Sequence, residues 1–330
     1  MNVGASGENL SSVSTVEVKQ RPALSRLGRP KEQFGRPGRR LSANKFAPYL
    51  LIAPFIIGFL GLSIFPILWS FLLSFESWSA TATTWVGLRN YHFVLTDPAV
   101  ATSFENLIWY VVVNDVFQIT IAVGLALILD LRFMRRYSVA LSAAFFLPNV
   151  VPGAAVAVIF ATLLGTNGLL PGALHLIGIN INWLGSASWS KPSVILAGSW
   201  QWIGFWVIVL VAALRAVPDE YYDAAKVDGA GLFPRIWHVS LPTIRPALVF
   251  VLTVNTIGTM QLFDVPFLLF GAGGGGGPLD SATTPAIQLY NFAFGNADLG
   301  SAAATGWLLT VAIMIVTLVF LGVARRREWL

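Results

Sequence analysis

Six long apolar stretches, separated by polar segments, dominate the chain after residue 45. Each is close to the ~20 consecutive apolar residues that an α-helix needs to cross a bilayer. The predicted spans are 47–75, 104–129, 139–163, 193–214, 246–270 and 303–323. This pattern predicts an all-α membrane protein with six transmembrane helices.

Composition supports this fold class. Of 330 residues, 55% are hydrophobic and only 11% are charged, whereas about 25% of residues are charged in a soluble domain. Lipid must therefore solvate much of the surface. The chain has a net charge of +5. In a membrane protein, an excess of Lys and Arg usually lies in the cytoplasmic loops, so we predict a lipid membrane and no nucleic acid as partner. The chain has no Cys, and its three His are far apart, so no metal site is predicted.

The distribution of Lys and Arg predicts the orientation. Counting the six spans from the N-terminus, 19 of these residues fall on the side of the N-terminal segment and two, Arg89 and Lys191, on the other. Because basic residues concentrate on the cytoplasmic side, both termini are predicted to be cytoplasmic.

Residues 1–45 are polar and rich in basic residues, and they are predicted to form a disordered cytoplasmic tail. Such a tail either fixes topology, the favoured interpretation, or binds anionic lipid. Residues 46–330 are predicted to form one six-helix domain.

The polar segment 218–246, between the fourth and fifth spans, has its own helical signals. Pro218 suits a first helical turn, and the Asp219 and Glu220 that follow place negative charge at the positive end of a helix dipole. Asp228-Gly229 predicts a break, after which Pro234 can open a second short helix. A connecting loop needs only a few residues, so the segment is predicted to be a cytoplasmic docking element.

Polar side chains within the spans are candidates for a solute pathway, because they are costly in lipid. In the second span Asn114 and Gln118 are four residues apart and share a helical face, which could line a cavity or, the favoured alternative, hydrogen-bond a neighbouring helix. In the fourth span the stretch 200–205 mixes Trp with Gln, a mixture that suits sugars because rings cover C–H faces and amides bind hydroxyls. The fifth span offers Asn255, Thr259 and Gln261.

No catalytic constellation is present in the sequence. Gly271, Gly273 and Gly276 match G-x-G-x-x-G, but no soluble strand precedes them and no P-loop Lys follows. The sequence also lacks the nucleophile elbow of hydrolases and the His-Glu-x-x-His of metalloproteases. The chain is therefore not predicted to be an enzyme.

The docking segment resembles the Glu-Ala-Ala loop of ABC importer permeases. Asp223-Ala224-Ala225, Asp228-Gly229-Ala230 and Leu241-Pro242 match it in order and spacing, with Asp223 in place of Glu and Ile236 in place of a frequent Phe. The resemblance implies a coupling loop that sits in a cleft of a separate ATP-hydrolysing subunit, where ATP and Mg²⁺ would be bound. The implied contact residues are Asp223, Ala224, Ala225, Asp228, Gly229, Ala230, Ile236, Leu241 and Pro242.

Other segments resemble the carbohydrate-type permeases of this class: residues 85–91, the Gly-Gly-Pro turn at 276–278, residues 290–294 and residues 300–304. The resemblance implies a type I importer domain, similar to maltose permeases, in a bacterial plasma membrane. It places Trp200, Gly204, Asn255 and Thr259 in the substrate pocket. It also implies as partners a second permease in a heterodimer, two ATP-binding subunits and an extracytoplasmic solute-binding protein.

We therefore expect an importer of a sugar, oligosaccharide or polyol. The main alternative is an ABC permease for a peptide, amino acid or phosphate, which fits residues 85–91 and the Gly-Gly-Pro turn poorly. An ion-coupled secondary carrier could use Asp115 and Asp264, but the sequence has no internal repeat and a carrier has no use for segment 218–246. A membrane scaffold would leave the polar faces without a role.

Overall fold

The computed structural model describes residues 47–78, 83–131, 133–271 and 275–327. The chain divides into two units, residues 1–57 and 58–330, and each is described by itself. The predicted basic tail lies outside the described residues, as do Gly273 and Gly274 of the glycine run. In the first unit, the described residues belong to the apolar helix α1 (Ala47–Phe59).

The regular secondary structure in the described part of the second unit is helical except for one hairpin. The longer helices are α4 (Pro98–Asp130), α6 (Gly153–Leu164), α8 (Ala187–Arg215), α12 (Arg245–Met260) and α15 (Leu299–Arg326). Shorter helices are α2 (Phe65–Leu73), α3 (Arg89–Thr96), α5 (Ser138–Phe146), α7 (Leu169–His175), α9 (Asp219–Val227), α10 (Leu232–Arg235), α11 (Leu241–Thr243), α13 (Asp264–Leu269) and α14 (Pro285–Tyr290). Single turns of other helix types are η2 (Leu60–Ile64), η3 (Leu147–Val150), η4 (Ile236–Ser240), η5 (Pro278–Asp280) and η6 (Asn291–Gly295). Strands β1 (Glu76–Trp78) and β2 (Thr83–Trp85) pair antiparallel, with Ser77 opposite Thr84.

By length and composition, five helical stretches can cross a membrane, and up to six if the bent pair Leu232–Thr243 and Arg245–Met260 counts as one span. The other five are Tyr49–Leu73, Pro98–Asp130, Gly153–His175, Ala187–Arg215 and Leu299–Arg326. The predicted all-α membrane fold is confirmed, with a hairpin as the one departure within the described residues.

The predicted third span, 139–163, is wrong as a single helix. The structure divides it into α5 with η3 and then α6. Val151 and Pro152 between them have extended backbones, with ψ of 128° and 141°. Proline disfavours the α conformation in the residue before it and cannot donate to the preceding turn, so Pro152 ends the first helix and begins the second.

The predicted fifth span, 246–270, is also interrupted. Helix α12 ends at Met260, and α13 begins only at Asp264. The 16 residues of α12 extend about 24 Å, less than the ~30 Å hydrocarbon thickness. The preceding stretch 232–243 meets α12 at a bend of 68°.

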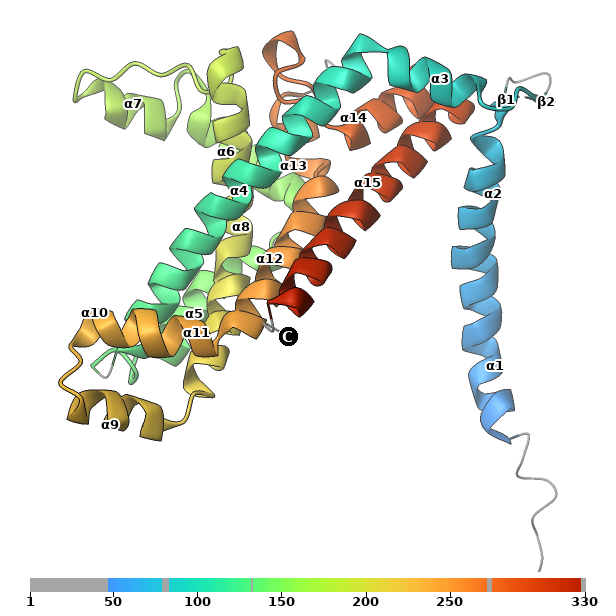
Figure 1. Cartoon of the computed structure of the whole chain (residues 1–330). Coiled ribbons are helices and arrows are strands. Elements are labelled where there is room, and N and C mark those ends of the chain that lie inside the picture. The colour runs from blue at the N-terminus through green and yellow to red at the C-terminus, as the bar shows by residue number, and fades with distance from the viewer. Residues whose placement is uncertain (1–46, 79–82, 132, 272–274, 328–330) are drawn as a thin grey trace, which may run out of the picture. The chain divides into compact units, whose positions relative to one another are not determined.

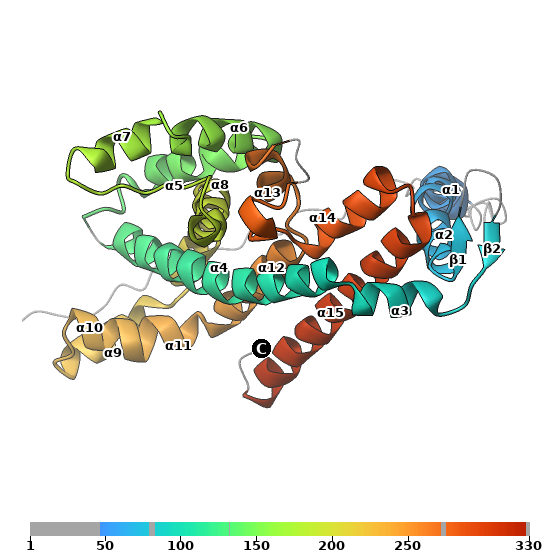
Figure 2. The ribbon, with the colours of Figure 1, turned by 90° about the horizontal axis from the view of Figure 1, so that it is seen from above.

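One of the buried hydrophobic clusters of the second unit lies where α4, α8 and α12 meet (Figure 2). Ala122 and Ala126 are fully buried one turn apart on α4, so their small side chains let α8 approach closely. Val207 and Leu210 of α8 fill that space, and Val251 of α12 belongs to the same buried cluster. The packing of these side chains therefore fixes how the three helices lie against one another.

Candidate functional site

A cavity of 320 Å³ lies between α4, α8 and α12. Its lining combines aromatic rings with amide and hydroxyl groups rather than charges. The lining residues are Tyr110, Asn114, Gln118, Val194, Ile195, Gly198, Gln201, Trp202, Phe205, Trp206, Val254, Asn255, Gly258, Thr259, Leu262 and Val265. A largely apolar wall with a few polar groups is the usual lining of a small-molecule site.

A chain of hydrogen bonds crosses the cavity wall from α8 to α12. The indole N–H of Trp206 donates to Gln118 Oε1 over 3.3 Å, and Gln118 Nε2 donates to Asn114 Oδ1 over 2.9 Å. Asn114 Nδ2 then donates to the hydroxyl of Thr259 over 2.8 Å, and that hydroxyl donates to the carbonyl of Asn255 over 2.9 Å. Both alternatives for Asn114 and Gln118 thus hold, because they join helices and line the cavity.

Asp115 lies beside this chain, next to Asn114 on α4, and is only 6% exposed. Its Oδ1 accepts a hydrogen bond of 2.7 Å from Asn255 Nδ2, and its Oδ2 accepts one from the hydroxyl of Thr256. A carboxylate in lipid requires such partners. Asp115 therefore faces protein, and its partners are on α12.

The structure places the predicted pathway residues unequally. Asn114, Gln118, Asn255 and Thr259 all line the cavity, but Trp200, Gly204 and Gln261 do not. The ring of Trp200 lies 5.8 Å from that of Phe160 on α6. A Cβ at Gly204 would overlap the carbonyl oxygen of Phe145, so this glycine permits close packing of α8 on α5. Gln261 is exposed at the end of α12.

Within the predicted stretch 200–205, the structure places Gln201, Trp202 and Phe205 in the cavity lining, and it adds Trp206, which sequence reasoning missed. Together with Val194 and Gly198, they form the face of α8 that borders the cavity. Helical spacing from Val194, through Gly198 to Gln201 and Phe205, was the signal that could have identified this face. Gln201 Nε2 donates to the carbonyl of Val151 over 2.8 Å, which ties α8 to the break before α6.

The predicted docking segment folds as a helical element, formed by α9, α10, η4 and α11, at one end of the bundle (Figure 1). Its first helix ends in a Schellman motif: Gly229 N–H donates to the carbonyl of Lys226, and Ala230 N–H donates to that of Ala225. Gly229 has a φ of 77°, which glycine adopts readily. Asp228-Gly229-Ala230 is therefore a helix-ending signal as well as a family-like sequence.

This element is exposed yet fixed to the bundle. Val217 and Ile244 at its two ends belong to the buried cluster at the helix crossing, and the hydroxyls of Tyr222 and Ser240 are 3.1 Å apart. Asp223 pairs with Lys226 over 2.7 Å, and this hydrogen bond and positive charge lower the pKa of the Asp223 carboxyl. These contacts connect α9 to α8 and α12, so a displacement of α9 can move the ends of both helices.

The most exposed aromatic side chains of the element lie close to the predicted Ile236. Phe233 is 73% and Trp237 is 66% exposed, whereas Ile236 is half-buried. Phe233 and Trp237 are four residues apart, a spacing that places two side chains on one face of a helical stretch. A groove of 430 Å³ between α9 and the following turns is lined by residues that include Ala224, Ala225 and Asp228.

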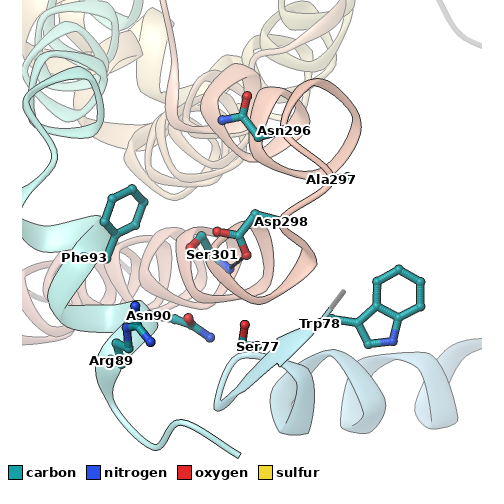
Figure 3. A pocket seen from close by; sticks show the side chains of 9 residues that line it. All are labelled: Ser77, Trp78, Arg89, Asn90, Phe93, Asn296, Ala297, Asp298 and Ser301. Atoms are coloured by element: carbon teal, nitrogen blue, oxygen red, sulfur yellow. Dashed lines mark hydrogen bonds between the residues drawn. The ribbon is translucent and has the colours of Figure 1, made fainter. Parts of the chain in front are cut away.

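A second hollow, of 530 Å³, lies at the other end of the bundle, among β1, α3 and the start of α15. Figure 3 shows Asn90, Asp298 and Ser301 around it. Asn90 Nδ2 donates to the carbonyls of Ser74 and Glu76, both over 2.9 Å, and a Cβ at Gly300 would overlap the latter. Part of the sequence resemblance at 85–91 and 300–304 thus corresponds to a packed joint between α2, α3 and α15. In the described part of the chain, no group of His, Asp or Glu could hold a metal ion.

Comparisons with known proteins identify a family and a shared fold. The family model for "Binding-protein-dependent transport system inner membrane component" matches residues 118–328. The lactose transport system permease protein LacF of Rhizobium radiobacter is 31% identical over 283 residues, covering 85% of this chain and 94% of its own. The arabinooligosaccharides transport system permease protein AraP of Halalkalibacterium halodurans is 28% identical, covering 84% and 87%. A chain of a bacterial alginate ABC transporter, crystallised with a periplasmic protein bound to alginate pentasaccharide, has the same fold, with a TM-score of 0.76 at 21% identity and coverages of 86% and 96%.

Proposed function

This chain belongs to the family of binding-protein-dependent transport system inner membrane components, and we propose that it is the permease subunit of an ATP-driven importer for a sugar, oligosaccharide or related polyol. The observation that carries the proposal is the uncharged cavity between α4, α8 and α12, where four amides and the hydroxyl of Thr259 lie among aromatic rings. Amides can bind sugar hydroxyls, and aromatic rings can cover the apolar faces of a sugar. The names of LacF and AraP, which refer to lactose and arabinooligosaccharides, support the same solute class.

The helical element 218–246 is proposed to couple this cavity to ATP hydrolysis by two separate ATP-binding subunits. The ATPase would contact Asp223, Ala224, Ala225 and the turn after them. It could also contact the exposed aromatic rings of Phe233 and Trp237. ATP and Mg²⁺ would bind to those subunits, so this chain needs no cofactor. Because α9 continues from α8 and α11 leads into α12, movement of the element would tilt two of the three cavity walls.

We propose two further partners. An extracytoplasmic solute-binding protein would deliver the solute, and a second permease, in a heterodimer, would complete the pathway. The pathway prediction still includes Trp200, Gly204 and Gln261. Trp200 and Gln261 have exposed surface that a second permease could cover. The distribution of basic residues supports a multi-pass protein of the bacterial plasma membrane with both termini and the coupling element in the cytoplasm.

Transport by the reconstituted complex tests the proposal. Vesicles containing this chain, the second permease, the ATPase and the binding protein should accumulate a radiolabelled sugar such as lactose, maltose or arabinotriose only with ATP. An ATPase inactivated in its nucleotide site is the control. Uptake that persists with the inactive ATPase would contradict the coupling proposal, and uptake of peptides, amino acids or phosphate without any sugar would favour the alternative solute class.

A further inference from the structure

We propose that Asp115 is a positioning residue that sets the solute specificity of the cavity. Its carboxylate turns the amide of Asn255 so that the amide oxygen faces the solute, and the carbonyl of Val151 does the same for Gln201. The solute must then offer hydrogen-bond donors, as sugar hydroxyls do, at both places. This inference rests on the proposed function in that the solute is taken to be a sugar.

The orientation of Asn255 follows from the chemistry of its partner. Both oxygens of Asp115 accept hydrogen bonds, Oδ1 from Asn255 Nδ2 and Oδ2 from Thr256. A carboxylate that accepts at both oxygens offers no hydrogen to an amide oxygen. If the Asn255 amide were flipped, its Oδ1 would meet Asp115 Oδ1 at about the 2.7 Å that now separates nitrogen and oxygen. Two acceptors at this distance repel each other, so Asn255 Oδ1 is left for the cavity.

The orientation of Gln201 has the same cause but a different partner. In a continuous helix, the carbonyl of Val151 would accept from the amide N–H of Ala155. Because the chain breaks at Pro152, Ala155 N–H donates instead to the carbonyl of Pro152 over 2.9 Å. The carbonyl of Val151 instead accepts a hydrogen bond of 2.8 Å from Gln201 Nε2. A carbonyl is only an acceptor, so the oxygen of Gln201 is also turned away from its partner.

These two oxygens differ from the other polar atoms of the cavity. In Asn114 and Gln118 both the amide oxygen and the amide nitrogen already have protein partners. Among the described residues, no group donates to Asn255 Oδ1 or Gln201 Oε1, although both side chains are buried and line the cavity. A solute that displaces water from these oxygens without donating to them leaves two desolvated acceptors unpaired, which is costly, so the cavity favours a solute that donates to these atoms.

Fluorinated sugars distinguish this arrangement from a general polar cavity, because fluorine in place of a hydroxyl cannot donate. The probes are lactose and maltose with their complete sets of monodeoxyfluoro derivatives, and the readout is the ratio of derivative to parent uptake in reconstituted vesicles. The binding protein also discriminates between these sugars, but its contribution cancels when two permease variants are compared with the same binding protein.

Wild-type complex should transport at least one fluoro derivative about tenfold less efficiently than its parent, the effect of one hydrogen bond. In Asp115→Asn the new amide can donate, so Asn255 can flip and this ratio should rise about tenfold. The double variant Asp115→Asn with Asn255→Asp restores an oxygen that faces the cavity, and its ratio should return to the wild-type value. Thr256→Val removes the other partner of Asp115 without freeing Asn255, and it should leave the ratio unchanged.

Equal ratios in wild type and Asp115→Asn would overturn the inference, as would a double variant that behaves like Asp115→Asn.

A second measurement does not depend on transport or on the folding of a variant. Solid-state NMR of wild-type complex, with only this chain labelled, should show close contact between Asn255 ¹⁵Nδ2 and Asp115 ¹³Cγ, and absence of that contact would also overturn it. If wild type transports none of the sugars while the contact is present, the proposed solute class fails but the amide orientation stands.

Discussion

Single glycines decide how closely elements of this protein approach one another. Gly204 lies where α8 crosses α5, and the carbonyl oxygen of Phe145 occupies the position that a Cβ would take. Gly198, also on α8, has open space at the same position. These two residues therefore offer a matched pair, because the helix propensity changes equally when either becomes alanine.

We predict that Gly204→Ala lowers the unfolding free energy by about 1–3 kcal/mol, the usual cost of overpacking, because α5 must move away from α8. Thermal unfolding of the purified chain in detergent measures this as a lower Tm. Gly198→Ala is the control and should keep or raise the Tm, since alanine is a better helix former. Equal Tm values for the two variants would contradict the close packing.

At the scale of elements, the coupling element depends on how α9 ends. The Schellman motif at Gly229 turns the chain back so that α10, η4 and α11 lie alongside α9 (Figure 1). Gly231, two residues later, has an ordinary extended backbone with a φ of −69°. A side chain is therefore strained at the first glycine and tolerated at the second.

We predict that Gly229→Ala destabilises the folded end of α9 by about 1 kcal/mol, because an L-residue is disfavoured at positive φ. The change should disturb α9 rather than the helix bundle. The affinity of the permease for its ATPase should fall about fivefold, while the Tm of the permease alone changes little. Titration of labelled ATPase into permease nanodiscs checks the affinity, with Gly231→Ala as the control. An unchanged affinity in Gly229→Ala would show that the end of α9 does not shape the contact.

At the scale of the whole molecule, the second unit carries different features at its two ends. One end carries the coupling element, and the other carries α3, α7 and α14 (Figure 1). The orientation proposed from basic residues places the coupling element in the cytoplasm. Because the chain has no Cys, single cysteines can report on each end without background.

We predict that cysteine at the exposed Val227 of α9 reacts with a membrane-impermeant maleimide only after the cell envelope is opened. Cysteine at the exposed Leu176, after α7, should react in intact cells when the reagent can reach the outer face of the plasma membrane. The yield of labelled permease on a gel is the measurement, and a denatured sample shows that each cysteine is reactive. The reverse pattern would refute the proposed orientation and the coupling proposal with it.

The sequence by itself determined the membrane class, the approximate positions of most spans and the helical character of the element 218–246. These depend on local causes: the cost of apolar surface in water, the hydrogen-bonding needs of a backbone in lipid, and the preference of glycine and proline for particular backbone angles. The signals at Pro218 and Asp228-Gly229 act within a few residues, so they were visible without a fold.

Only the tertiary structure decided which polar residues share a cavity. Trp200 and Gln201 are neighbours in the sequence, yet one packs on α6 and the other borders the cavity. Successive residues of a helix point about 100° apart, so the rotation of α8 against α4 and α12 selects between them. That rotation depends on contacts between distant segments, such as Ala122 and Ala126 against Val207. The partners of Asp115 on α12 and the carbonyl freed at Pro152 likewise come from segments that meet only when the helices pack.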